Sequence, residues 1–490
     1  MVFSSHLFIY YFLPAALLGY YALWRAPQRW RNLWLVLTGY LFYGWAGPGF
    51  TLLMFMTTSF DWLMSLVIAR NDWRVWRLWR GDVLLVPPGA KTQQQKLALF
   101  LSILSNLTVL GFFKYFNFAV GSYNGLSGFL GLSQAQWHTT LQIVLPLGIS
   151  FYTFQALSYI IDVYRGEAVA MANFIDFSCF VSMFPHLVAG PILKFSFLST
   201  QLTSRTLTSE KFARGVAFFC LGLVKKILLA NPCGSIADAT FNAHSVGCLD
   251  AWFGAVAYSF QIYFDFSGYS DMAIGLGLML GFVFAKNFDS PYRADSITDF
   301  WRRWHISLSS WLREYVYIPL GGNRQGEFRT YVNLMLTMLL GGLWHGASWN
   351  FVIWGGIHGG MLAFERGRQR QSIYAALPKP IRIGVTFLVV TFGWVFFRAS
   401  DLPAATAYLS SMFGFGHPSS QAMLISGIIH DRYLLFSWVV AAVVVWTAPQ
   451  TWTWTQALTW RKAAICFALA ALALGTLATQ QSNPFIYFIF

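Results

Sequence analysis

Long apolar runs, separated by short polar stretches, follow one another along the whole chain. A membrane-spanning helix needs about 20 mostly apolar residues, whereas membrane strands alternate apolar and polar positions over about 10. The runs here are long and do not alternate, so they predict helices. The predicted spans are 5–24, 32–48, 51–69, 97–118, 141–161, 216–231, 250–284, 331–365 (out and back), 383–398, 433–449 and 463–480.

Some segments do not fit a plain span. The 35 residues of 250–284 and of 331–365 would each measure about 52 Å as helix, against a hydrocarbon core of about 30 Å. Because two full crossings need about 60 Å, segment 331–365 is predicted to turn back inside the membrane. For segment 250–284, three alternatives stay open: a tilted helix, a broken helix and a helix that turns back. Segment 174–200 is expected to be re-entrant, because prolines and glycine within 185–191 interrupt it.

The composition indicates that lipid is the main solvent of this chain. The 490 residues are 56% hydrophobic and 11% charged, whereas soluble proteins carry roughly 25% charged residues. These values exclude an ordinary soluble enzyme, a coiled coil and a disordered chain. Residues 1–490 are predicted to form one membrane domain. Its first apolar run is expected to be retained, because it lacks the basic start and cleavage site of a secretory signal.

Lysine and arginine positions predict the orientation in the membrane. Of 33 such residues, 28 lie in six segments between apolar runs, and the loops 119–140, 231–249 and 399–431 contain none. Cytoplasmic loops are enriched in these residues, so the basic segments are assigned to the cytosol and both termini to the other side. The net charge of +14 fits this assignment and anionic lipid. No nucleic-acid partner is predicted.

The strongest candidate for chemistry is GGLWHGASWN, which contains His345. This histidine lies near the expected turn of 331–365, inside the membrane, and the three glycines around it are expected to leave a channel open. An imidazole with a pKa near 6.5 can take a proton from a hydroxyl at neutral pH. A packed structural histidine is the alternative, and His358 in WGGIHGG could take the same role.

Residues 299–323, DFWRRWHISLSSWLREYVYIPLGGN, form a second candidate cluster. Their apolar and aromatic residues recur at helical spacing on one face, and charged residues take the other. The pattern predicts one amphipathic helix on the cytosolic surface, with His305 on its buried face near the inner mouth of the channel. A structural role for His305 is the alternative.

Two aspartates lie in the middle of an apolar segment. Asp265 and Asp271, in YFDFSGYSDMAIGLG, need partners because a charge in lipid is costly. Ion-coupled transporters use such carboxylates, so the competing hypothesis is a transporter of acyl donor or polysaccharide without covalent chemistry. The sequence contains no cysteine and histidine cluster with zinc spacing and no phosphate-binding or serine-hydrolase motif. No metal is predicted.

Four sequences together resemble the bacterial membrane-bound O-acyltransferases (MBOAT) of polysaccharide O-acetylation. They are MVFSSHLFIYYFLP, the 299–323 sequence, LGGLWHGASWNFVIWGGIHG and the terminal PFIYFIF. The resemblance implies an all-α polytopic membrane protein, a ring of about 11 tilted helices with re-entrant and interfacial helices around a central tunnel. It also implies an O-acyltransferase that takes acetyl-coenzyme A or another acyl thioester from the cytosol and meets an acceptor hydroxyl from the periplasm.

The resemblance assigns roles by position within its motifs. His345 in WHG is implied to be the catalytic base, His305 in WHIS a second active-site histidine, and His358 a supporting residue. The tail is similar to the FxYxxF ending of a small peptide that serves related D-alanyl transferases of teichoic acids. Tyr487 is therefore a candidate acyl carrier, and an interfacial aromatic anchor is the alternative.

The resemblance also implies partners and a location. Arg302, Arg303 and Lys286 are expected to meet donor phosphates. The expected partners are the lipid bilayer, a periplasmic SGNH-type acetyltransferase that completes the transfer, and a polysaccharide synthase or export complex. The expected location is the bacterial inner membrane with both termini periplasmic. Alginate, cellulose, another exopolysaccharide and peptidoglycan all stay open as the polymer, and so does an acyl-carrier protein as donor.

Overall fold

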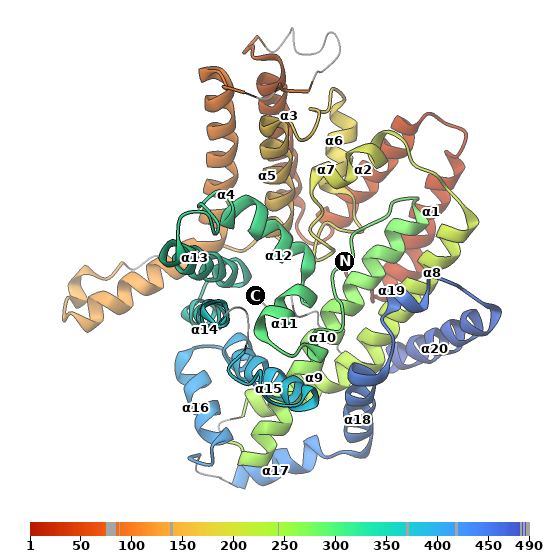
Figure 1. The fold of residues 1–490 in the computed structure, drawn as a ribbon. Helices are drawn as coiled ribbons and strands as arrows, with labels where there is room; N and C mark the ends of the chain where they lie inside the picture. Colours follow the sequence, from red (N-terminus) through yellow and green to blue (C-terminus); the bar gives the residue numbers. More distant parts are fainter. Residues whose placement is uncertain are drawn as a thin grey trace. The chain divides into compact units, whose positions relative to one another are not determined.

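The protein is an assembly of helices, seen here in a computed structural model (Figure 1). The structure describes residues 1–74, 85–87, 89–137, 141–243, 245–368, 372–416, 420–480, 483 and 486, and these ranges contain no strand. The predicted all-α fold class is confirmed. Two compact units can be distinguished, Met1–Phe212 with Gly277–Phe284, and Ala213–Leu276 with Ala285–Phe490. That residues 1–490 act as one domain stays a prediction.

The first unit contains the helices from the N-terminus to α7. These are η1 (Phe8–Phe12), α1 (Leu13–Ala22), α2 (Gln28–Gly44), α3 (Pro48–Arg70), α4 (Gln93–Phe129), η3 (Ser133–Ala135), α5 (Ile149–Arg165), α6 (Phe174–Ser182) and α7 (Phe195–Thr203). Helix α3 packs along α4 and α5. The Asp61 carboxylate of α3 accepts hydrogen bonds from Ser102 and Asn106 of α4, so a polar contact ties two apolar helices together.

A buried elbow joins α6 to α7. His186 lies in it with no exposed surface, and its Nε2 donates to the Phe180 carbonyl at 2.8 Å. The interruption predicted within 174–200 is therefore confirmed, and His186 has a structural contact at that point.

The second unit contains the remaining helices around an aromatic core. Helix α8 (Ser209–Val224) begins in the first unit and continues into the second. The others are η4 (Lys225–Ala230), α9 (Asn231–Phe241), α10 (Cys248–Met279), η5 (Pro291–Arg293), α11 (Ile297–Arg303), α12 (Ile306–Leu312), η6 (Arg313–Tyr317), α13 (Glu327–His345), α14 (Trp349–Gly367), α15 (Lys379–Arg398), α16 (Leu402–Met412), α17 (Ser420–Ile429), α18 (Arg432–Thr447), α19 (Thr451–Trp454) and α20 (Trp460–Thr479). Trp304, Trp354 and Trp394 lie in its core.

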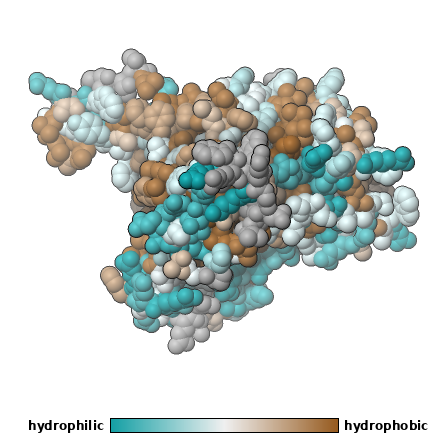
Figure 2. All heavy atoms as spheres, turned by 90° about the horizontal axis from the view of Figure 1, so that it is seen from above, coloured by the Kyte–Doolittle hydropathy of each residue, from teal (hydrophilic) through white to brown (hydrophobic). Residues whose placement is uncertain are grey.

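Several helices suit a lipid environment. Among the described residues, α3, α4, α15 and α20 are each long and apolar enough to cross a membrane, and α17 with α18, bent by 65°, would make a fifth span. Large apolar side chains face outward, including Phe129, Met423 and Trp460, which are 87%, 82% and 91% exposed. Figure 2 shows hydrophobic atoms on the face seen from above, next to hydrophilic ones. The protein is a membrane protein, and the count of about 11 spans stays a prediction.

The two overlong segments fold differently from each other. Helix α10 runs unbroken for 32 residues, or about 48 Å, so the segment neither breaks nor turns back within it. Segment 331–365 forms the hairpin of α13 and α14, which pack along each other (Figure 1). The chain turns directly after His345, so the turn itself is confirmed, and its place inside the membrane stays a prediction.

The prediction of one amphipathic helix over 299–323 is wrong. The chain instead forms α11, α12 and η6, and the first two are separated at His305. The backbone φ of His305 is +43°, which a continuous right-handed helix does not contain. Trp304, Leu308 and Trp311 of the predicted face are buried, so the periodicity identified burial correctly and missed the break.

Close glycine packing of the α13 and α14 hairpin can be tested with neighbouring residues. A Cβ at Gly355 would lie 2.5 Å from the Met338 carbonyl oxygen, whereas at Gly356 the nearest atom, Leu339 Cδ2, would lie at 3.9 Å. Gly355→Ala is therefore expected to lower the Tm in detergent, since overpacking costs about 1–3 kcal/mol. Gly356→Ala should keep or raise the Tm, because alanine favours helix by roughly 1 kcal/mol. Equal Tm values for both variants would contradict this explanation.

Candidate active site

His345 is the last residue of α13 and is 6% exposed. The glycines around it have different roles. A Cβ at Gly342 would collide with the Phe351 carbonyl oxygen, and one at Gly346 with the Phe351 ring. These two glycines therefore let α14 approach α13, and the expectation that they keep a channel open is wrong. Gly341 does line a cavity together with His345.

His305 sits at the break between α11 and α12, and Asn287 holds that break. The Ile306 N–H donates to the Asn287 backbone carbonyl at 2.9 Å. The Asn287 side-chain Oδ1 accepts from the Ser307 N–H at 3.3 Å and the Ser307 hydroxyl at 2.8 Å. A left-handed backbone costs a residue other than glycine roughly 1–2 kcal/mol, and these hydrogen bonds offset that cost. No pattern in the sequence points to Asn287, which lies in the connection before η5.

The hydrogen bonds also fix the proton position on His305. Asn287 Oδ1 accepts from Ser307, so it is an oxygen, and the Nδ1 of His305 at 3.2 Å must carry its hydrogen. The lone pair is then on Nε2, which has no hydrogen-bond partner among the described residues. Burial lowers the pKa of His305 to about 3, so the ring is neutral at pH 7.

The structure brings the two predicted histidines together. The ring centroids of His305 and His345 are 6.3 Å apart, and the Trp344 ring lies 6.0 Å from His305. The two side chains come from different elements, α13 and the break before α12. Within the described part of the chain, no group of three or more histidine, cysteine, aspartate or glutamate residues is arranged to hold a metal ion.

A cavity of about 460 Å³ has His345 on its wall. Its exposed rim carries Arg302 and Arg313, and Arg366 also lines it. Leu312 and Met338 are among its apolar lining residues. Guanidinium groups bind phosphates well, and an apolar passage suits a flexible organic chain. The cavity can therefore take a phosphate-bearing molecule whose far end reaches the imidazole.

The three predicted phosphate contacts differ in their surroundings. Arg302 lines the cavity of His345 and also a second, polar cavity of about 370 Å³. Arg303 lines only the polar cavity, and its Nε donates to Asp299 at 2.8 Å. Lys286 pairs with Asp289 at 2.8 Å and lines neither cavity. Arg302 is the member of this set that shares a cavity with His345.

His358 is tied to the surrounding tryptophans. Its Nδ1 accepts from the Trp301 indole N–H at 3.3 Å. Trp354 separates it from the site, with ring centroids 4.9 Å from His358 and 5.3 Å from His345. His358 does not line the cavity of His345. This placement fits a supporting residue, and it identifies Trp354 as a neighbour of the site that the sequence analysis missed.

Tyr487 lies outside the described residues, but its neighbour Ile486 is described. Ile486 is 4% exposed and belongs to the aromatic core of the second unit. Its backbone N–H donates to the carboxylate of Asp265 at 2.9 Å. The chain next to Tyr487 is therefore bound inside the second unit.

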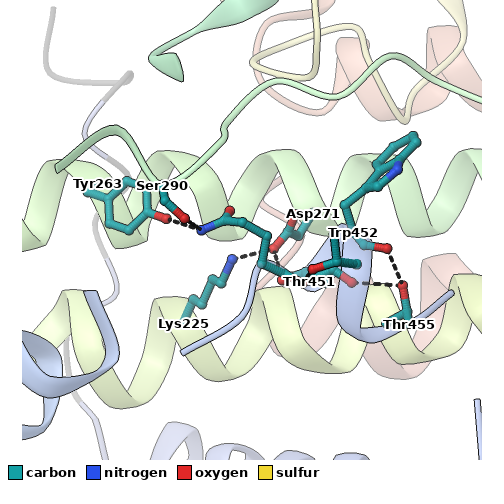
Figure 3. Close-up of polar contacts among 9 residues, drawn as sticks. Lys225, Tyr263, Asp271, Ser290, Thr451, Trp452 and Thr455 are labelled. Carbon is teal, nitrogen blue, oxygen red and sulfur yellow. Dashed lines mark hydrogen bonds and ion pairs between the residues drawn. The ribbon is translucent and has the colours of Figure 1, made fainter. Parts of the chain in front are cut away.

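Both aspartates of α10 have lysine partners. The Lys226 ammonium lies 2.8 Å from Asp265, and the Lys225 ammonium lies 2.6 Å from Asp271. Figure 3 shows the second pair, with Thr451 also bound to Asp271. The sequence signal for these pairs was the presence of two adjacent lysines, Lys225 and Lys226, in an apolar run.

Comparisons with known proteins found a matching family and several relatives. Residues 165–399 match the model of the MBOAT, membrane-bound O-acyltransferase family. The chain is 46% identical to the probable alginate O-acetylase AlgI of Azotobacter vinelandii, over 90% of this chain and 84% of that protein. It is 35% identical to the peptidoglycan O-acetyltransferase of Helicobacter pylori, over 90% of this chain and 86% of that protein. It is 27% identical to the teichoic acid D-alanyltransferase of Bacillus subtilis, over 53% of this chain and 69% of that protein.

The dependence of the α11–α12 break on Asn287 can be tested with two variants of similar size. Asn287→Leu removes the acceptor and leaves the buried Ser307 N–H and hydroxyl without it, which costs about 1–3 kcal/mol per group. We expect a clear loss of Tm. Asn287→Asp keeps an oxygen at Oδ1 and should retain most of the stability. If both variants unfold at the same temperature, the Oδ1 contacts do not hold the break.

Proposed function

The chain belongs to the membrane-bound O-acyltransferase family, and on that premise we propose which reaction its site performs. The enzyme, an O-acyltransferase, takes an acetyl group from a cytosolic thioester and passes it through the membrane for O-acetylation of an exported polysaccharide. The main support is the placement of His345 on the wall of the arginine-rimmed cavity, with His305 6.3 Å away between ring centroids.

His345 is the proposed general base. It removes the proton of an acceptor hydroxyl, and the oxygen attacks the carbonyl carbon of the thioester. The carbon–sulfur bond then breaks, and the leaving sulfur takes up the proton that His345 holds. A positioned base of this kind contributes roughly 10²–10⁴-fold to a rate.

His305 is proposed to position the reacting groups. With its hydrogen on Nδ1 and bound to Asn287, its Nε2 can accept a hydrogen bond and cannot donate one. This favours a role in orienting a hydroxyl or the neighbouring imidazole over polarising the thioester carbonyl, which needs a donor.

Acetyl-coenzyme A is the proposed donor, and an acyl-carrier protein presents a similar phosphate and thioester. Arg302, with Arg313 and Arg366, would hold the phosphates at the rim while the thioester reaches His345. Arg303 and Lys286 have carboxylate partners, so we assign them a smaller share of donor binding.

Tyr487 is the proposed first acceptor. Its hydroxyl would receive the acetyl group and hand it to a periplasmic SGNH-type acetyltransferase that completes the transfer. The support is the similarity of the terminal sequence to FxYxxF and the binding of Ile486 within the second unit. We further propose the bacterial inner membrane as the location, with both termini periplasmic, and a polysaccharide synthase or export complex as partner.

The competing transporter hypothesis gains no support from α10. Asp265 and Asp271 would have to bind the coupling ion, yet each is already neutralised by a lysine ammonium within 3 Å. We therefore retain the enzyme as the proposal.

Intact mass spectrometry tests the relay directly. Purified wild type, His345→Ala and Tyr487→Phe are incubated with labelled acetyl-coenzyme A. We expect an acetyl adduct in wild type and none in either variant. Thioester cleavage that depends on His345 without any adduct would contradict the Tyr487 carrier and keep the acyltransferase. Neither adduct nor cleavage in a protein that binds the donor would contradict the proposed reaction.

The donor site can be tested with two neighbouring arginines. Arg302→Met should raise the KM for acetyl-coenzyme A by about 10-fold or more, because a hydrogen bond to a charged group contributes about 1.5–3 kcal/mol. Arg303→Met removes an arginine that already pairs with Asp299, and we expect less than a threefold change. Steady-state kinetics at fixed ionic strength measures both, and equal KM values would argue against donor binding at Arg302.

A further inference from the structure

Polar side chains of α9 and α10 bind three residues of the C-terminal segment, which we define as residues 480–486. The Asn231 side-chain amide donates to Gln480 Oε1 at 2.7 Å and to Asn483 Oδ1 at 3.1 Å. Asp265 then accepts the N–H of Ile486 at 2.9 Å. The three bound residues, Gln480, Asn483 and Ile486, fall three positions apart along the chain.

The contact at Asp265 differs from the other two because it involves a buried charge. Asp265 and Lys226 are 1% and 4% exposed, and their charged atoms lie 2.8 Å apart. A buried ion pair is costly unless further hydrogen bonds satisfy it, and the Ile486 N–H supplies one to the carboxylate. A bond to a backbone N–H also fixes the position of the chain whatever its side chain, and such charge-assisted bonds are strong.

Ile486 lies in the same hydrophobic core as the aromatic residues that contact His305. Ile486 belongs to the cluster that contains Phe266 and Phe288. The Phe266 ring meets His305 edge-on at 4.6 Å, and Phe288 stacks at 6.5 Å. Holding Ile486 therefore keeps the chain in the hydrophobic cluster whose members Phe266 and Phe288 contact His305.

A second ion pair on the same helix has another role. Asp271 accepts from Lys225 at 2.6 Å and from the Thr451 hydroxyl at 2.7 Å (Figure 3). It thus ties α10 to α19 instead of to the C-terminal segment. Its two side chains are 15% and 13% exposed. The chain therefore offers a matched control, a lysine–aspartate pair whose aspartate lies six residues further along α10.

We propose that Asp265, charged and oriented by Lys226, is a positioning residue that holds the chain at Ile486 so that Tyr487 meets the histidine site. The proposal rests on the proposed acyl-carrying function of Tyr487. Asp265 does not touch substrate. It acts by setting where the C-terminal segment lies, and its loss should slow transfer to Tyr487 without weakening donor binding.

Two double variants separate the effect of the hydrogen-bond acceptor at position 265 from the effect of its charge. Lys226→Met with Asp265→Asn removes both charges and keeps an oxygen that can accept the Ile486 N–H. Lys226→Met with Asp265→Leu has a side chain of similar size and no acceptor. Hydrogen exchange of the C-terminal peptide should be about 10-fold faster or more in the leucine variant, and close to wild type in the asparagine variant.

Kinetics then tests the positioning role. In the leucine variant, the rate of acetyl adduct formation should fall at least 10-fold with an unchanged KM for acetyl-coenzyme A, and the asparagine variant should restore most of it. The control, Lys225→Met with Asp271→Leu, should leave exchange of the C-terminal peptide as in wild type. Wild-type exchange in the Asp265→Leu variant, or equally fast exchange in the control, would overturn the proposal.

The two proposals can fail separately. Fast exchange in the leucine variant with an unchanged rate of adduct formation would overturn the positioning role while the acyl carrier stands. The acyl-carrier proposal is tested separately by Tyr487→Phe, made in the otherwise wild-type enzyme. It is contradicted if this variant transfers acetyl as fast as the parent enzyme.

Discussion

A helix that ends inside an apolar environment must find partners for its last backbone groups within the protein, because no water is present to bind them. The site is built at two helix ends. Helix α13 ends at His345, and α12 begins directly after His305. At the second end, Asn287 supplies a backbone carbonyl to Ile306 and a side-chain oxygen to Ser307. Backbone hydrogen bonding therefore fixes the chain at His305, directly before α12.

These helix ends give the two histidines different surroundings. His345 lies on the cavity wall, where a substrate can reach it, and His305 lies behind it with its Nδ1 already bound to Asn287. The cavity leads from the exposed charge of Arg302 to the imidazole. A molecule with phosphate at one end and thioester at the other would be oriented by that charge alone, because only one direction places phosphate at the rim. The proposed division of roles, with His345 meeting the reactants and His305 orienting them, follows from this difference in surroundings.

The sequence predicts the parts of this architecture that depend on length and hydropathy. The turn after His345 followed from a segment too short for two crossings, and the helices of the predicted spans are present. The break at His305 could not be predicted, since the apolar periodicity continues through it and the stabilising partner, Asn287, comes from another part of the chain. Nor could the sequence separate a glycine that packs, such as Gly342, from one that lines a cavity, such as Gly341, because only the position of the opposite helix decides this.

Helix packing also decides where the charges of α10 can find partners. A Cβ at Gly222 would lie 2.5 Å from the carbonyl oxygen of Gly268, so α8 and α10 touch backbone to backbone. Asp265 and Asp271 lie three residues to either side of Gly268, and the two lysines that follow α8 come within reach of both. Each carboxylate then needs a further donor to offset its burial. Asp271 finds a threonine hydroxyl on α19, whereas Asp265 finds the N–H of Ile486. A contact between two glycines thus leads, through one buried ion pair, to the binding of Ile486 in the core that also contains the aromatic neighbours of His305.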